Sequence, residues 1–278
     1  MRTSFILKQE YKFLLLIFLL SSIILFFSYI SITGALDMFN SLVLVPADYG
    51  YPKSLVPEMW QVFIKSFNGI TAPYYIRDLS PLVAFVICLF SPIIYSKYKE
   101  RLLVYYIGKS NNYYKYRKHL SLKIAIIIAS IFTLAMITII IICYIINPTI
   151  EVENIKEVFA SYYNTKMLFI DIIFKNNILI MIFFLFFNFW LFEFILCWFA
   201  NFLYDYLKNI VFVMLVMFII FYIIPFLAFD NIYLRPFVLI TAVFTNYNAN
   251  MMWYHYFLPY LQLVIIYLIV KRVKKYEI

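Results

Sequence analysis

The sequence SKYKERLLVYYIGKSNNYYKYRKHLSLK, at residues 96–123, contains eight Lys or Arg residues and a single acid, Glu100. Apolar stretches flank it at 79–95 and 124–146, and each has a length that lets an α-helix cross a bilayer. Basic residues in a short loop between two membrane spans hold that loop on the cytoplasmic side, because Lys and Arg resist translocation. We therefore predict that residues 96–123 face the cytoplasm, and this fixes the orientation of the other segments.

The composition predicts a protein embedded in lipid. Of the 278 residues, 65% are hydrophobic and only 13% are charged, whereas about a quarter of a typical soluble domain is charged. A soluble core of this size could not bury so much apolar side chain. The net charge of +9 falls mainly in the predicted cytoplasmic loops, so membrane orientation explains it and no nucleic-acid partner is needed.

Hydrophobic length and charge bias together predict an all-α, polytopic integral membrane protein with six transmembrane helices and both termini in the cytoplasm. The segments assigned to the cytoplasm hold 16 of the 23 Lys and Arg residues. The bias towards Ile, Phe, Tyr, Asn and Lys favours a bacterial cell membrane as the location. We predict one transmembrane domain with spans at 13–33, 79–95, 124–146, 178–200, 210–229 and 255–270, a cytoplasmic loop at 96–123, and outside loops at 34–78, 147–177 and 230–254.

Local patterns predict further elements on both sides of the membrane. In the first outside loop, four apolar residues follow the spacing of an amphipathic helix that starts after Ser54 and stops near Gly69. We expect this helix to lie on the outer leaflet or to cover the bundle, with direct substrate contact as the alternative. The four residues are Trp60, Phe63, Ile64 and Phe67.

In the cytoplasmic loop, we expect the second span to continue as a helix to Gly108. A separate short helix over 113–120 then precedes the third span. A second cytoplasmic link, at 201–209, joins the fourth and fifth spans, and Pro225 kinks the fifth span. Small residues at Ala125, Ala129 and Thr133 indicate close helix packing in the third span.

Polar residues inside the predicted spans are the first candidates for function. They are Asn188, Glu193 and Gln262. Glu193 is the only acid within a span, and it either reaches a polar or cationic partner or faces a conduit or a subunit interface. No second ionisable group is evident at a similar depth, which argues against a proton-driven carrier. The three cysteines, Cys88, Cys143 and Cys197, are expected to be buried thiols that pack as small hydrophobic groups.

Catalytic motifs are not evident, and we expect that the chain is not an enzyme and holds no cofactor. The two histidines, His119 and His255, fall on opposite sides of the predicted membrane and exclude a two-histidine metal site. The run Gly108-Lys109-Ser110 matches the end of a phosphate-binding loop, but position 103 is Leu rather than the required glycine. We therefore expect that this chain alone does not hydrolyse ATP.

The six spans together with residues 96–123 resemble the ABC transporter type 2 permease family. Glu100-Arg101, Gly108, the predicted helix and Lys123 stand where that family has a charged segment, a turn, a short helix and a Lys-bearing entry to the third span. The resemblance implies a permease subunit that pairs with a second permease subunit, identical or different, and with separate ATPase subunits that hold ATP and Mg²⁺. It also implies that the short helix binds the ATPase, through Tyr113, Tyr114, Tyr116, Arg117 and Lys118.

The leading hypothesis is therefore the permease subunit of an ATP-driven ABC exporter. The aromatic, charge-poor spans favour an amphipathic peptide or a lipid-like molecule as its substrate. The same basic helix could instead lie on anionic membrane lipid. The alternative function is a membrane-embedded enzyme or an assembly scaffold without an ATPase partner, which would use Glu193, His255 and the outside loops.

Overall fold

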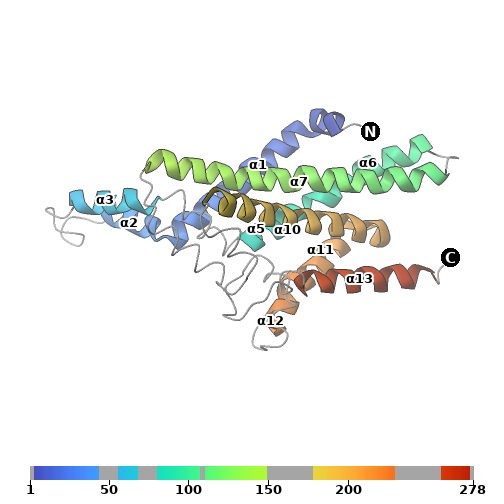
Figure 1. The fold of residues 1–278 in the computed structure, drawn as a ribbon. Coiled ribbons are helices and arrows are strands. Elements are labelled where there is room, and N and C mark those ends of the chain that lie inside the picture. Colours follow the sequence, from blue (N-terminus) through green and yellow to red (C-terminus); the bar gives the residue numbers. More distant parts are fainter. Residues whose placement is uncertain are drawn as a thin grey trace.

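The computed structural model describes residues 3–43, 56–67, 80–106, 110–148, 178–228 and 258–275. Within these ranges the only regular secondary structure is helical. Figure 1 shows an elongated bundle in which α7 runs along most of the length. The helices are α1 (Thr3–Ile32), α2 (Ala35–Val43), α3 (Val56–Ser66), α5 (Ser80–Cys88), α6 (Phe90–Tyr106), α7 (Ser110–Ile146), α10 (Ile178–Leu207), α11 (Ile210–Phe218), the π-helix η1 (Ile219–Ile223), α12 (Ile224–Ala228) and α13 (Leu258–Lys275).

Three of the described helices are long and apolar enough to cross a membrane. These stretches are Gln9–Ser31 in α1, Lys115–Ile146 in α7 and Phe186–Leu207 in α10. The prediction of an all-helical protein with membrane-spanning helices is confirmed at this level for the described residues. Six spans, and the side of the membrane on which each terminus lies, remain predictions.

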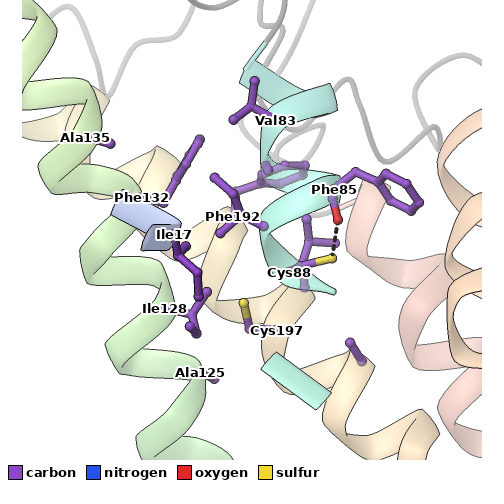
Figure 2. Packing of buried hydrophobic residues seen from close by; sticks show 14 of the residues in the cluster. Ile17, Val83, Phe85, Cys88, Ala125, Ile128, Phe132, Ala135, Phe192 and Cys197 are labelled. Carbon is purple, nitrogen blue, oxygen red and sulfur yellow. Dashed lines mark hydrogen bonds between the residues drawn. The ribbon is translucent and has the colours of Figure 1, made fainter. Parts of the chain in front are cut away.

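The core forms where α7 packs against α10, α1 and α6. Figure 2 shows Ile128 and Phe132 of α7 next to Ile17 of α1 and Phe192 of α10, and all four are buried. The predicted stripe of small residues on α7 is a packing feature: Ala125 and Ala129 are fully buried, and the Thr133 hydroxyl donates a hydrogen bond to the Ala129 carbonyl. Small side chains let the neighbouring helices approach closely.

The outer faces of the helices carry large apolar side chains. On α1, for example, Leu15, Leu19 and Phe27 are exposed, and α7 exposes Leu134 and Ile145. Apolar patches of this extent are rare on proteins surrounded by water, and they suit a surface covered by lipid tails.

Both chain ends point towards one end of the bundle (Figure 1). The end of α6, the start of α7 and the end of α13 lie towards this end (Figure 1). We call it the basic end, because the start of α7 carries the exposed Lys115 and Lys118 and the end of α13 carries the exposed Lys271. At the opposite end, α2 and α3 project beyond the bundle (Figure 1). The bundle is therefore asymmetric in charge along its length.

Two segments that the sequence predicted as separate from the spans are continuous with them. The prediction of a separate short helix over 113–120 is wrong, because α7 runs unbroken from Ser110 to Ile146. The link predicted at 201–209 is helical as far as Leu207, so α10 extends through most of it. In both places the sequence lacks Gly and Pro, and the inward helix face stays buried through Leu120 and Leu203, so nothing ends the helix where the hydrophobic run ends.

The predicted second span consists of two helices, α5 and α6, separated by a turn at Leu89. Pro92 has no N–H group, so the carbonyl of Cys88 lacks the donor that a continuous helix would supply four residues later. As predicted, α6 continues beyond the apolar stretch, and it reaches Tyr106.

The fifth span is irregular around Pro225, as expected. The π-helical segment η1 precedes this proline, and the N–H of Ile224 donates to the carbonyl of Ile219, five residues earlier. A π-helical turn of this kind widens the helix locally, so the predicted kink is spread over a full turn.

The amphipathic helix of the first outside loop is confirmed as α3. Its Phe63 is half-buried and Phe67, just after its end, is buried, while Ile64 stays exposed. The Tyr29 hydroxyl of α1 donates to the Ser66 carbonyl at 2.5 Å, and the Tyr29 and Phe67 rings are in contact. The helix therefore covers the end of α1.

Several predicted features lie outside the described residues, so the structure does not test them. They are the cap at Ser54, the stops at Gly69 and Gly108, His255, and most of the outside loops 147–177 and 230–254.

Candidate functional site

A row of polar residues lies along one face of α10. Glu193, Cys197, Asn201 and Asp205 recur every four residues, a spacing that places them on one side of a helix. We call this row the α10 polar stripe. It runs from the apolar core to the basic end, and it contacts α5, α6 and α7 at three levels.

At the basic end, Asp205 joins three helices. Its two carboxylate oxygens accept hydrogen bonds from the Tyr95 hydroxyl of α6, at 2.9 and 3.0 Å. Lys99 of α6 lies 2.7 Å from one oxygen, and the Nε atom of Arg117 of α7 lies 3.5 Å from the other. All of these charged groups are largely shielded, so their attraction is stronger than that of an exposed pair. One carboxylate thus fixes α6 and α7 to the end of α10.

One turn deeper, Asn201 makes a second connection between the same three helices. It is fully buried, and its Oδ1 atom accepts a hydrogen bond from the Ser91 hydroxyl of α6 at 3.0 Å. Its Nδ2 atom donates to the Ser121 carbonyl of α7 at 3.2 Å. Hydrogen bonding on both sides of the amide offsets the cost of burying it.

Deeper still, Glu193 is fully buried. The Cys197 thiol donates to its Oε1 atom at 3.3 Å, and its Oε2 atom has no hydrogen-bond partner. Cys88 of α5 lies on the facing side, where its thiol donates to the Phe85 carbonyl at 3.0 Å (Figure 2). Among the described residues Glu193 has no ion-pair partner, and its carboxyl group is enclosed between helices. The choice between polar surroundings and a conduit or a subunit interface stays a prediction.

The cysteine prediction is confirmed in part. Cys88, Cys143 and Cys197 are all free and buried. Cys197 is more than a small hydrophobic group, however, because among the described residues it is the only hydrogen-bond donor to the buried acid.

A second polar network ties the start of α1 to α6. Glu10 accepts hydrogen bonds from Lys97 and from the Tyr98 hydroxyl, the latter at 3.1 Å. Gln9 accepts from Arg101 at 2.9 Å and from Tyr98 at 3.2 Å. Burial, together with the hydrogen bond to Glu10, raises the pKa of Tyr98 to about 12. Tyr98 therefore remains a neutral donor at physiological pH.

The predicted partner-binding residues lie on the first turns of α7, where some side chains face the bundle and others are exposed. Arg117 points into the bundle towards Asp205, with its guanidinium group 6.0 Å from the centre of the Tyr113 ring. The side chain of Tyr114 lies outside the described residues. Four side chains on this part of α7 are exposed and form the surface that we call the α7 tip: Lys115, Tyr116, Lys118 and His119.

The other intramembrane candidates do not join the α10 polar stripe. Asn188 precedes Glu193 by five residues, which places it about 140° around the helix from the stripe. Gln262 is half-buried on α13, where its Nε2 atom has no hydrogen-bond partner. The structure thus does not bring the three predicted residues into one site.

The sequence contained a signal for part of this arrangement. The four-residue spacing of the α10 polar stripe can be recognised once 201–207 is taken as helix rather than loop. Glu10 and Tyr95 could not have been selected, because their role depends on partners about 90 to 110 residues away in the sequence.

The described residues form no metal centre, and no similar protein was found from which a function could be inferred. Among the described residues, no group of three or more His, Cys, Asp or Glu side chains is arranged to hold a metal ion. Comparison with family models, curated proteins and solved structures found no match to this chain. The features of this bundle that bear on function are the α10 polar stripe and the α7 tip.

Proposed function

We propose that this chain is the membrane-spanning subunit of an ATP-driven exporter, and that a separate ATPase subunit binds the α7 tip. The observation that carries this proposal is that α7 is one continuous helix of 37 residues. One end exposes cations and an aromatic ring, while one face of the remainder packs against α1, α6 and α10. Such a helix joins a docking surface directly to the membrane core.

The connections made by Asp205 support a mechanical role for α7. A displacement of the α7 tip would act on α10 through Arg117, and on α6 through Lys99 and Tyr95. Asn201 joins the same three helices one turn deeper. The closure of an ATPase pair on ATP would therefore act on all three helices through these contacts.

The chemistry of the α7 tip suits an acidic groove on a protein partner. Lys115 and Lys118 can pair with carboxylates, and the Tyr116 ring offers rigid contact area at a small entropic cost. Exposed charge pairs guide association and are screened by salt. We expect binding of the ATPase to weaken as the salt concentration rises.

The remaining parts of the proposal follow the same resemblance. The basic end faces the cytoplasm of a bacterial cell, ATP and Mg²⁺ belong to the ATPase, and the chain works beside a second permease subunit. An amphipathic peptide or a lipid-like molecule is the proposed substrate, because the bundle presents apolar and aromatic surface with few charges.

The test is affinity purification of the tagged full-length chain from its native host in mild detergent. ATP hydrolysis is measured in the eluate, and copurifying proteins are identified by mass spectrometry. We expect an ATPase with a phosphate-binding loop in the eluate, and its loss when Lys115→Glu and Lys118→Glu are combined. The matched control combines Lys271→Glu with Arg272→Glu, an equal charge reversal at exposed positions of α13 at the same end.

Two outcomes would count against the proposal. If both charge reversals leave the ATPase bound, the α7 tip is not its docking surface. If no ATPase copurifies, but the wild-type chain binds anionic vesicles more tightly than the α7 variant does, the tip is a lipid-binding surface.

A further inference from the structure

The most unusual group in the described bundle is the carboxyl group of Glu193. Glu193 lies on α10, a helix with the length and composition of a membrane span, and its side chain is fully buried between this helix and its neighbours. Within the part of the chain that the structure describes, its only hydrogen bond comes from the Cys197 thiol, which is a weak donor, and its Oε2 atom has none. An acid that is enclosed in this way, with one oxygen unpartnered, needs an explanation.

The groups that face Glu193 carry no positive charge. From α5 the facing group is the Cys88 thiol, and from α10 itself it is the Cys197 thiol. The Ser91 hydroxyl of α6 lies beside Cys197, and the Tyr222 hydroxyl of η1 lies near Cys88. Figure 2 shows the apolar side chains of Ile128 and Phe132, from α7, on the side of Phe192 and Cys197. No Lys, Arg or His of the described residues forms an ion pair with Glu193.

This environment favours the neutral acid over the carboxylate. An ionised carboxylate in an apolar interior requires a cation or several strong donors, and here there is one thiol. A protonated carboxyl group loses only the hydrogen bond of its own O–H group, which is a much smaller cost. The unpartnered Oε2 atom is the natural position for that proton.

We propose that Glu193 is a proton-binding site: in the closed bundle it is a neutral carboxylic acid, and it releases its proton when α10 separates from α5 and α6. Separation would admit water to Oε2, and water solvates both the carboxylate and the released proton. The closed bundle then binds one more proton than the open one, so a higher pH favours opening. This inference goes beyond the proposed ATPase partner and does not depend on it.

Infrared difference spectroscopy tests the protonation state directly. The full-length chain is reconstituted in lipid nanodiscs at neutral pH and compared with Glu193→Gln. We expect a C=O stretching band of a protonated carboxylic acid in the wild type, which is absent from the variant. Asp205→Asn is the matched control, and it should remove carboxylate absorption without affecting that band. A carboxylate band for Glu193 at neutral pH would overturn the proposal.

Carbodiimide labelling tests the link to opening. With dicyclohexylcarbodiimide, the carboxyl proton moves to a reagent nitrogen while the oxygen attacks the central carbon. The adduct then rearranges to a stable N-acylurea, with no leaving group. Labelling is performed at acidic pH, where a carboxyl group that is exposed to water is still partly protonated and can react. Under this condition we expect Asn201→Ala, which loosens the joint between α6, α7 and α10, to increase the labelling rate of Glu193 at least several-fold. Ser91→Ala removes one hydrogen bond of the same joint and provides a milder test if Asn201→Ala does not fold.

These outcomes separate the two proposals. Labelling that is equally fast in both variants and in the wild type would contradict the coupling between the proton and opening. An ATPase that is lost on changing the α7 tip, or retained, has no bearing on the protonation of Glu193, so each proposal can fail alone.

Discussion

At the scale of single residues, shielded acids paired with partners on other helices hold the basic end together. Asp205 accepts hydrogen bonds or ion pairs from α6 and α7, and Glu10 binds two residues of α6. A charge that is shielded from water and loses its partner keeps the full cost of desolvation. These acids should therefore be more sensitive to substitution than the exposed charges around them.

Asp205→Asn should destabilise the bundle, because Lys99 and Arg117 would lose the anion that they share. We expect a loss of about 2 kcal/mol in the free energy of unfolding, typical of hydrogen bonds to charged groups. This loss in the free energy of unfolding is measured by unfolding the protein with sodium dodecyl sulfate in mixed micelles. A double-mutant cycle with Lys99→Met should give a clearly non-additive result. Additive effects, or an effect no larger than that of Glu58→Gln at an exposed site on α3, would contradict this role.

Tyr98 should make the protein sensitive to alkaline pH. Its pKa is raised to about 12 in the folded state, by burial and by its hydrogen bond to Glu10, against an ordinary value of about 10. Its contribution to stability is therefore complete below pH 10 and is lost as the pH rises through 12. Melting temperatures between pH 9 and about 12 should fall more steeply for the wild type than for Tyr98→Phe. Parallel curves would show that Tyr98 titrates normally.

How much of the site could be predicted differs from residue to residue. Glu193 was selected from the sequence because an acid inside an apolar run is rare, and the structure encloses it completely. Its surroundings could not be predicted, since Cys88 lies on another helix and three-dimensional packing alone brings it near. Arg117 was expected to face a partner, yet it contacts Asp205 inside the bundle. The sequence therefore identifies which ionisable side chains are unusual, but tertiary packing determines which residues they contact.

At the scale of elements, the sequence located the helices better than it located their ends. The basic residues at 113–120 and the end of the apolar run near Ala200 favoured breaks, but helices α7 and α10 continue through both places. The positive-inside rule assigns a side of the membrane and says nothing about secondary structure. Pro225, in contrast, acts on the backbone directly, and the irregular turn before it was predicted. The turn at Leu89, close to Pro92, was not predicted, because the second span was expected to be one helix.

The turn between α10 and α11 offers a test at this scale. It contains only Lys208 and Asn209, and Lys208 has a φ angle of 55°, in the region that favours glycine. Lys208→Gly should raise the free energy of unfolding by up to about 1 kcal/mol. Asn209→Ala should lower it by about 1 kcal/mol, because the Asn209 side chain accepts a hydrogen bond from the Val211 N–H at 2.8 Å.

The measurement for this turn is again unfolding in mixed micelles, with the two variants compared under one condition. Opposite signs for the two variants are the expected result. A loss of stability in Lys208→Gly would show that the lysine side chain contributes more to the turn than its backbone conformation costs.

At the scale of the whole molecule, the bundle is polar at one end and apolar along its sides. Three described helices are suited to cross a membrane, and lipid-compatible side chains cover their outer faces. The α10 polar stripe extends from the buried acid Glu193 to the basic end, and its residues make hydrogen bonds or ion pairs at successive turns. Contacts with α6 and α7 occur at the levels of Asn201 and Asp205.

The side of the membrane on which the α7 tip lies can be measured directly with single cysteines. The native cysteines are all buried, so an exposed cysteine at Lys118→Cys should react with a membrane-impermeant maleimide over a low background. We predict labelling in inside-out vesicles and none in intact cells, with the reverse pattern for Glu58→Cys on α3, at the far end. Labelling of Lys118→Cys in intact cells would place the α7 tip outside the cell, and no cytoplasmic ATPase could then drive it.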